Sequence, residues 1–513
     1  MLRTIGNLRR LVAVARILAR HDALFPLADL GVAPTITALA GMMSHKNVEG
    51  RPGERLARAL TEAGPSFIKL GQALSTRSDL LGEEMAEDLS KLQDRLAPFS
   101  GTQARATVED ELGEPVNAVF TSFEDEPVAA ASIAQVHFAV TSDGREVAVK
   151  ILRPGIERAF HRDVALLRWI ARIIERTRPD LRRLKPVEVV DTLADTVELE
   201  MDLRFEAAAA AELRENFEDD EDFMVPEVDW GRTSQRVLTT ERLSGIPLDD
   251  RAAIEAAGHD PVDVLEKAAR ATFKQIFRDG FFHADTHPGN LFVKNDGRIG
   301  AVDFGIMGRL DLKSRKHLGE LLLAFLVRDY RRAAEVHFEA GWVPGHRSVD
   351  AFTQACRSIA EPILDKPQNE ISIGRLLGQL FQITETFHME TQPQLLLLQK
   401  TMLVAEGTAR KLSPEANMWL LARPLIEDWM VSHLGPEARV RDTVEVLTDA
   451  VGRLPRVLND FEEGVGKLAD GHVKLHPDTI RALRDEPGGK NPVPAIWVGV
   501  LFFVIVLLFV KIF

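Results

Sequence analysis

The sequence predicts an α+β chain with two lobes, a small lobe of strands and helices followed by a larger helical lobe. Short runs that alternate apolar and polar residues at 118–152 predict strands, because strand side chains point to opposite faces in turn. Helical periodicity dominates from 160 to 216 and beyond 246, with one compact loop-and-strand block at 280–310. A helical extension is expected before the small lobe and an apolar transmembrane helix at the end.

The bulk composition limits the classes of function. At 513 residues the chain is too long for one compact core, and 45% hydrophobic with 27% charged residues is ordinary globular composition. A net charge of −14 argues against nucleic acid as the main partner, since phosphate contacts need a basic surface. The single cysteine, Cys356, excludes a disulfide framework within the chain and a cysteine-rich zinc site.

Both ends of the chain favour a membrane. Residues 1–25 place Leu and Val beside Arg at helical spacing, which predicts a helix lying on anionic membrane lipids. A basic helix packed on the protein body and a cleaved organellar presequence are the alternatives. Val493–Val510 carries no charge and as a helix would be about 27 Å long, enough to cross a bilayer. Basic residues before this run favour a cytoplasmic body, whereas a buried core helix would be expected to show a polar face.

The densest pattern of reactive residues lies in the block at 280–310. His283-Ala-Asp285-Thr-His287-Pro-Gly-Asn290 has the D-x-x-x-x-N interval of a kinase catalytic loop, and Asp303-Phe-Gly follows after a short hairpin. Phosphoryl transfer needs a carboxylate near the nucleophile and oxygen ligands for Mg²⁺. We therefore predict Asp285 as the catalytic carboxylate and Asn290 and Asp303 as metal ligands.

A different metal site is the competing interpretation of the same loop. His283, Asp285 and His287 alternate, and imidazole with carboxylate suits zinc or iron. However, Pro288-Gly289 makes the segment a loop rather than a strand, and this interpretation leaves Asp303-Phe-Gly without a role.

Lys150 ends the second strand of the predicted hairpin in Val147-Ala-Val-Lys150, as the phosphate-binding lysine of kinases does. A solvent-facing lysine on an edge strand is the bland alternative. Such a lysine needs a glutamate from a neighbouring helix, and Glu198, Glu200 and Glu206 are the candidates.

Alanines replace the glycine-rich phosphate loop of ordinary kinases. Since alanine carries a Cβ, this loop adopts positive φ less freely, and we expect fewer close backbone contacts to phosphate. Its candidate nucleotide-binding residues are Ala129, Ala130, Ala131, Ser132, Ala134, Gln135 and Val136. No Walker A sequence offers a substitute.

Taken in order, these motifs resemble the ABC1/ADCK/UbiB family of atypical kinases, most closely its bacterial UbiB members. The resemblance rests on Lys69-Leu-Gly-Gln72 (the family's KxGQ), the alanine-rich loop, Glu200-Met-Asp202 (its ExD) and Leu89–Asp94, and it covers about residues 55–430. Thr286 replaces a proline of the family pattern, and Ala134 stands where glycine is frequent, which leaves the ligands intact.

The resemblance implies further roles. Lys69 and Gln72 would lie on a helical extension folded across the nucleotide cleft, with Lys69 facing Glu200, and all three would belong to the catalytic set with Asp285. Lys150 would pair with Glu206.

The resemblance also implies a setting. ATP and Mg²⁺ would be the cofactors of an ATPase or atypical kinase that supports ubiquinone biosynthesis at the bacterial inner membrane, tail-anchored with a cytoplasmic body. Its partners would be anionic lipids and quinone-precursor lipids or ubiquinone-biosynthesis enzymes, with a homodimer left open. The alternatives are a kinase acting on a protein or small metabolite, and a nucleotide-gated scaffold of a biosynthetic complex.

The expected organisation has six parts. They are a membrane-surface helix (1–45), the KxGQ extension (46–117), the kinase-like N-lobe (118–245), the helical C-lobe (246–430), a helical tail (431–492) and the anchor (493–513).

Overall fold

The computed structural model divides the chain into two units, Met1–His433 and Leu434–Phe513. The structure describes residues 2–25, 48–75, 83–90, 92, 96–177, 185–362, 383, 386–389, 393–413, 424–426 and 429–430. The predicted tail and anchor lie outside these residues. Within the described part of the chain, no helix combines the length and the apolar character needed to cross a membrane.

The small lobe is built on an antiparallel sheet with the strand order β1-β3-β4-β6, in which β2 pairs with β3. The strands are β1 (Phe120–Phe123), β2 (Ala129–Ala130), β3 (Ala134–Thr141), β4 (Glu146–Leu152) and β6 (Val237–Glu241). The predicted hairpin is β3–β4, and its register places Val136 opposite Lys150. On the other face of β4, Val147, Val149 and Ile151 are buried in a core shared with α8 (Gly101–Leu112) and α9 (Val116–Val119).

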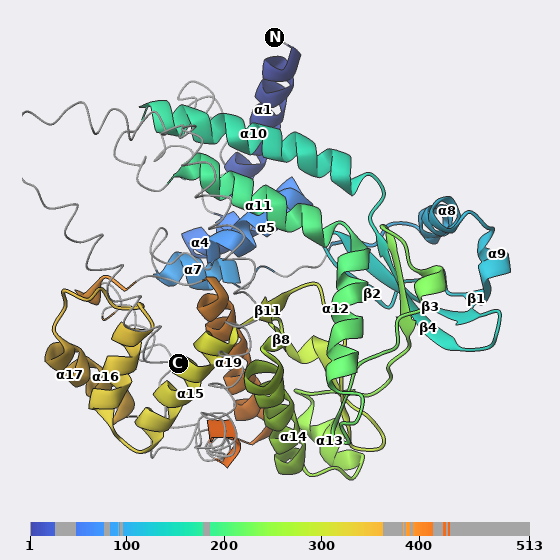
Figure 1. Cartoon of the computed structure of the whole chain (residues 1–513). Coiled ribbons are helices and arrows are strands. Elements are labelled where there is room, and N and C mark those ends of the chain that lie inside the picture. The colour runs from blue at the N-terminus through green and yellow to red at the C-terminus, as the bar shows by residue number, and fades with distance from the viewer. Residues whose placement is uncertain are drawn as a thin grey trace, which may run out of the picture. The chain divides into compact units, whose positions relative to one another are not determined.

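Three helices follow β4, where the sequence predicted one long helical region. They are α10 (Ile156–Thr177), α11 (Pro186–Glu200) and α12 (Leu203–Asn216). The break between α11 and α12 falls at Met201-Asp202, and the Asp202 carboxylate caps α12 by accepting a hydrogen bond from the Arg204 backbone N–H. The two halves of this segment therefore point in different directions, as Figure 1 shows.

An N-terminal extension packs against helices α10 and α11. It comprises α1 (Leu2–Arg20), α4 (Pro52–Ala63), α5 (Pro65–Ser75) and α7 (Glu83–Ser90). Helix α5 contacts both α10 and α11, and α1 contacts α4 and α10 (Figure 1, blue). The extension thus packs on the helices that follow β4.

The apolar face of the first helix packs on protein in this structure, and contact of the helix with membrane lipid stays a prediction. Leu11, Val14 and Leu18 of α1 are buried in the main core together with residues of α4 and α10. Arg10 adds an ion pair with Asp163 of α10, with 2.7 Å between Nε and Oδ1. The helix is amphipathic because it packs on protein, which is the first alternative given above.

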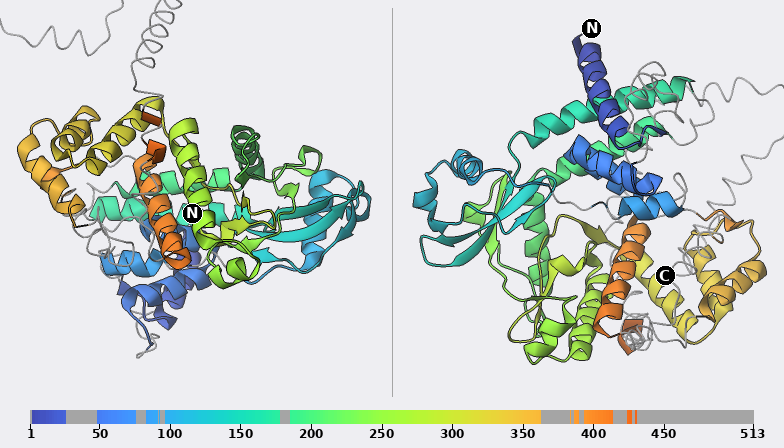
Figure 2. Two further views of the ribbon diagram at one scale, coloured as in Figure 1. Left: turned by 90° about the horizontal axis from the view of Figure 1, so that it is seen from below. Right: turned by 180° about the vertical axis from the view of Figure 1, so that it is seen from behind.

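The larger lobe surrounds the compact block with helices. Strands β5 (Phe223–Met224), β7 (Ile246–Pro247), β9 (Leu291–Val293) and β10 (Ile299–Ala301) form one sheet, and β8 (Phe281–His283) pairs with β11 (Met307–Arg309). The helices are α13 (Arg251–Ala256), α14 (Pro261–Phe273) with a π-helical end at Lys274–Asp279, α15 (Leu312–Leu326), α16 (Tyr330–Glu339), α17 (Val349–Ala360) and α19 (Pro393–Leu412). Helix α19 contacts α14 and β11, beside the block that carries the predicted catalytic loop (Figure 2, orange).

Candidate active site

Lys150 lies at the centre of the site. Its ammonium Nζ is 2.7 and 2.9 Å from the two carboxylate oxygens of Glu206 and 2.8 Å from Oδ1 of Asp303. Burial disfavours the charged form, but the carboxylates of Asp303 and Glu206 raise the pKa of this lysine above its ordinary value. Strand β4, helix α12 and the loop after β10 therefore converge on one cation.

One ammonium faces two carboxylates, so the three groups carry a net negative charge when both acids are ionised. Burial raises the pKa of Glu206 to about 7, against the opposing effect of Lys150. Lys150 in turn holds the pKa of Asp303 well below its ordinary range. The Glu206 side chain is 8% exposed and that of Asp303 is 50% exposed. Asp303 thus presents a charged, accessible carboxylate at a site that favours a further cation.

The backbone at Asp303 has φ of +64°, in the left-handed region that non-glycine residues adopt infrequently. Asp303 follows β10 after one residue and comes before Phe304, which is buried and whose ring centroid is 5.5 Å from that of His283. A strained backbone held by packing on both sides is typical of functional positions. Here it coincides with the residue that sequence spacing predicts as a metal ligand.

The loop after β8 arranges Asp285 and Asn290. The Asn290 amide nitrogen donates a hydrogen bond to the Asp285 carbonyl oxygen over 3.0 Å, which closes the loop on itself. The other end of this amide, its oxygen, is the atom suited to Mg²⁺. Asn290 and Asp303 therefore carry oxygen atoms of the hard kind that this ion prefers, and the Lys150 ammonium lies beside Asp303.

The histidines of this loop have structural roles, which argues against the zinc or iron interpretation. His283 is buried, its Nδ1 accepts a hydrogen bond from the Asp285 N–H, and its Nε2 contacts the Val302 carbonyl oxygen. Burial lowers the pKa of His283. His287 Nδ1 accepts from the Gly289 N–H. Among the described residues, no group of three His, Cys, Asp or Glu side chains could hold a metal ion.

The extension reaches the same site through Lys69. Its Nζ is 2.8 Å from Oε2 of Glu200, and the two side chains are only 11% and 13% exposed. The Lys69 charge also contributes to the lowered pKa of Asp303. Both pairings that the resemblance implied, Lys69 with Glu200 and Lys150 with Glu206, are therefore present. Gln72 lies one helical turn beyond Lys69 on α5 and is partly buried.

Hydrogen bonds to the backbone fix the conformation of the alanine-rich loop. The Ala131 N–H donates to the Ala134 carbonyl over 2.8 Å, and the Arg153 guanidinium donates to the Ala131 and Ser132 carbonyls. These bonds fix the backbone of a loop that lacks glycine. Val136 lies opposite Lys150 in the β3–β4 register, and Ala129 and Ala130 form the short strand that pairs with β3.

The Gln135 side chain lies on the face of the sheet away from Lys150, and the predicted role of this residue in nucleotide binding stays a prediction. Its side chain is buried and pairs with both the N–H and the carbonyl of Phe99, at 3.0 and 3.2 Å. It also contacts Nε2 of His137, which is buried on the same strand. Strand alternation places this face away from Lys150, so the Gln135 side chain anchors the segment before α8 instead.

Sequence reasoning missed Lys400 of α19. Its Nζ lies 2.8 Å from Oδ1 of Asp285. The only indication in the sequence is that a lysine ends an apolar run, Leu395-Leu-Leu-Leu-Gln-Lys400. A lysine at such a position ordinarily extends its ammonium group into solvent at the edge of the apolar helix face.

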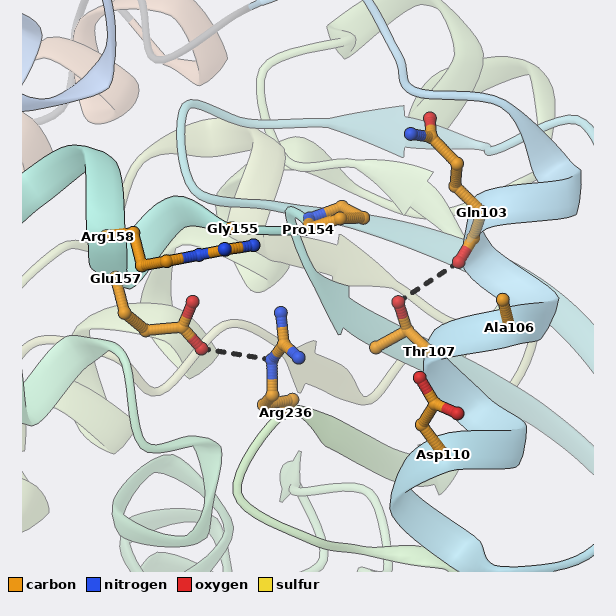
Figure 3. A pocket seen from close by; sticks show the side chains of 9 residues that line it. All are labelled: Gln103, Ala106, Thr107, Asp110, Pro154, Gly155, Glu157, Arg158 and Arg236. Carbon is orange, nitrogen blue, oxygen red and sulfur yellow. Dashed lines mark hydrogen bonds and ion pairs between the residues drawn. The ribbon is translucent and has the colours of Figure 1, made fainter.

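A hollow of about 270 Å³ lies elsewhere, between α8 and the start of α10 (Figure 3). Its polar lining includes an Arg236–Glu157 ion pair at 3.0 Å and a Thr107 hydroxyl that donates to the Gln103 carbonyl. The residues that line it are Gln103, Ala106, Thr107, Asp110, Pro154, Gly155, Glu157, Arg158 and Arg236. It contains none of the predicted site residues, and its charged groups are paired at least in part, so we assign it no chemistry.

Comparison with known proteins places this site in a family. Residues 91–337 match the ABC1 atypical kinase-like domain and residues 356–417 match the UbiB helical domain. The chain is 44% identical over 445 residues to the "Probable protein kinase UbiB" of Marinobacter nauticus, covering 85% of this chain and 81% of that protein. It is 42% identical to the protein of the same name from Vibrio cholerae, covering 94% and 91%. The chain therefore belongs to the UbiB family of ABC1 atypical kinases.

A solved structure supports the kinase-like bilobal fold. A Mycobacterium tuberculosis protein, solved as a complex with erythromycin, shares 27% sequence identity and a TM-score of 0.52. The match covers 77% of this chain and 98% of that one. The fold prediction of two kinase-like lobes with a helical extension agrees with this likeness.

Proposed function

We propose that this protein uses ATP and Mg²⁺ for phosphoryl transfer at the Lys150 site. The observation that carries the proposal is the convergence of Glu206 and Asp303 on one lysine, with all three contacts between 2.7 and 2.9 Å. A kinase needs this lysine held by a helix glutamate and needs the Asp-Phe-Gly carboxylate beside it. The excess negative charge of the three groups suits a divalent cation.

Each group then has a physical role. Lys150 would bind the α- and β-phosphates, and Asn290 and Asp303 would hold Mg²⁺, which neutralises the charge that develops on the phosphates. Asp285 would accept the proton of the attacking hydroxyl or water. The rigid loop around His283 keeps Asp285 in place, since its backbone N–H is bound to the buried ring.

We favour water or a small lipid-linked molecule as the phosphoryl acceptor. The Lys69–Glu200 ion pair ties α5 of the extension to the end of α11, close enough to Asp303 for the Lys69 charge to act on it. A bulky protein substrate would have to displace this helix. The family membership and the names of the relatives support a role in ubiquinone biosynthesis. The apolar run Val493–Val510 supports attachment to the inner membrane, where quinone-precursor lipids and anionic lipids would be its partners.

The test compares Asp303→Asn with a matched control, Asp296→Asn. Asp296 lies in the turn between β9 and β10 and pairs with Arg298 at the surface, so the control makes the same chemical change a few residues away. We expect Asp303→Asn to lower ATP hydrolysis by about 100-fold or more and to weaken Mg²⁺-nucleotide binding, because it removes a metal-binding charge. Hydrolysis at the wild-type rate in Asp303→Asn would refute the assignment.

The same pair of variants tests the biological role. In a deletion strain, Asp296→Asn should restore the ubiquinone content and Asp303→Asn should not. If both restore it, the scaffold alternative is favoured over the enzyme. Labelled phosphate that appears on a protein or metabolite, and not in water, would favour the kinase alternative.

A further inference from the structure

Lys400 is brought to the predicted catalytic carboxylate by a helix far along the chain. Its Nζ lies 2.8 Å from Oδ1 of Asp285, and the two side chains remain 42% and 35% exposed. Its charge also acts on the buried His283 ring, where it opposes protonation. Because the Lys400 side chain is partly exposed, its ammonium can contact a substrate that binds beside the Asp285 carboxylate.

The other basic side chains near the site have different partners. Lys150 contacts Glu206 and Asp303, and Lys69 pairs with Glu200. Within the loop, His287 accepts a hydrogen bond from the Gly289 N–H through Nδ1, so it caps the short turn that leads to Asn290. None of these groups is placed beside Asp285 as Lys400 is.

Phosphoryl transfer develops charge on the equatorial oxygens of the moving group, and positioned cations stabilise it. On the nucleotide side, Lys150 and a Mg²⁺ ion held by Asn290 and Asp303 would do this. On the acceptor side, next to Asp285, the structure provides Lys400. We propose that Lys400 is a further catalytic residue, whose ammonium donates a hydrogen bond to an oxygen of the transferring phosphoryl group.

The step balances without any further reactant. The bond between the γ-phosphorus and the β–γ bridging oxygen breaks, and its electron pair leaves with ADP. The acceptor oxygen forms the new bond to phosphorus and gives its proton to the Asp285 carboxylate. Lys400 keeps its proton throughout. Because an ammonium has three N–H donors, it can bind Asp285 and the phosphoryl oxygen together.

This proposal rests on the proposed function, so its test separates nucleotide binding from stabilisation of the transferring group. The probes are Mg²⁺-ADP alone and Mg²⁺-ADP with aluminium fluoride, which imitates the transferring phosphoryl group. Affinities of the full-length protein for both are measured for wild type, Lys400→Met and Lys400→Arg. Lys411→Met is the control, because Lys411 lies on the same helix and pairs with Asp249 at a distance of 2.9 Å, outside the site.

We expect Lys400→Met to weaken the aluminium fluoride complex by about 30-fold, the effect of one lost charge-assisted hydrogen bond. Its affinity for Mg²⁺-ADP alone should stay within about threefold of wild type. The value of kcat should decrease by about the same factor as the affinity for the aluminium fluoride complex, while KM changes little. Lys400→Arg keeps the charge and should recover most of the loss, and Lys411→Met should behave as wild type.

The outcomes that overturn the proposal are distinct. Equal weakening of both complexes would make Lys400 a structural residue, and no weakening of either would remove it from the site. Wild-type protein that binds Mg²⁺-ADP but forms no fluoride complex would also refute it. If wild type binds no Mg²⁺-nucleotide at all, the proposed function fails first, and this inference fails with it.

Discussion

Replacing Arg10 tests whether the first helix belongs to the folded body. The Arg10 guanidinium holds the Asp163 carboxylate through Nε at 2.7 Å and Nη2 at 3.0 Å, and it also donates to the Ala63 carbonyl at 2.9 Å. The Asp163 side chain is only 3% exposed. Arg10→Met therefore leaves a buried carboxylate with one weaker neighbour, Arg162 at 3.3 Å.

We expect Arg10→Met to destabilise the packing of α1 by about 3 kcal/mol, which is the lower end of the range for breaking a buried ion pair. The loss is at the lower end because Arg162 compensates in part and Arg10 itself is 19% exposed. Helix α1 should then open locally, and a loss of that size corresponds to a fall of about 100-fold in hydrogen-exchange protection of its amides. The assay is hydrogen–deuterium exchange of residues 2–20 without lipid. Arg9→Met, on the exposed side of the same helix, is the control.

A double variant sharpens the test. Arg10→Met combined with Asp163→Leu removes both charges and should recover much of the protection, since an apolar pair leaves no buried charge unpaired. Protection of α1 that stays within about threefold of wild type in Arg10→Met would refute the reasoning. Wild-type α1 that is protected only when lipid is added would support the prediction of a membrane-surface helix.

The remaining predictions concern the charge at the site and the pH range of stability. Lys69→Met removes a positive charge that acts on Asp303, so the affinity for Mg²⁺-ADP should rise several-fold in calorimetric titration; a lower affinity would show that Lys69 helps to bind the nucleotide. His337 donates a hydrogen bond from Nδ1 to the Ala333 carbonyl oxygen at 2.7 Å. Burial lowers the pKa of this ring, so the folded protein resists a proton that the unfolded chain takes up below about pH 6.5. Its stability should therefore be complete above that pH and fall as the pH drops below it, and the drop in Tm between pH 8 and pH 5.5 should be smaller in His337→Gln. An equal drop in both proteins would contradict this.

The sequence was most informative where the chemistry is local in the chain. The D-x-x-x-x-N interval from Asp285 to Asn290 and the hairpin that places Lys150 on β4 depend on short turns, and the structure contains both. Lys400 could not be recognised in this way, because its contact with Asp285 joins residues 115 positions apart. Nothing about a lysine on an amphipathic helix specifies which distant loop it meets.

The first helix shows a second limit of prediction from sequence, and this limit does not depend on the separation of residues along the chain. The pattern of Leu11, Val14 and Leu18 shows that one face of α1 avoids water, but lipid and protein both satisfy that requirement. Only the partner surface decides between them. Here the decisive residue is Asp163, whose burial on α10 requires a cation that α1 supplies. Pairing of an arginine with a buried acid across separate helices cannot be recognised from periodicity alone.

The choice among the three candidate glutamates depends on one helix end. Had α11 continued through Asp202, Glu198, Glu200 and Glu206 would have been spread over a single helix. The chain instead restarts at α12 with Asp202 as its cap, so Glu200 ends one helix facing Lys69 and Glu206 lies one turn into the next, facing Lys150. Glu198 stays at the surface, 3.4 Å from His161. An aspartate that precedes a helical stretch is a recognisable N-cap. The Asp202 carboxylate accepts a hydrogen bond from the first turn of α12, and this cap explains why a new helix begins there. The break between the helices in turn assigns the two glutamates to two different lysines.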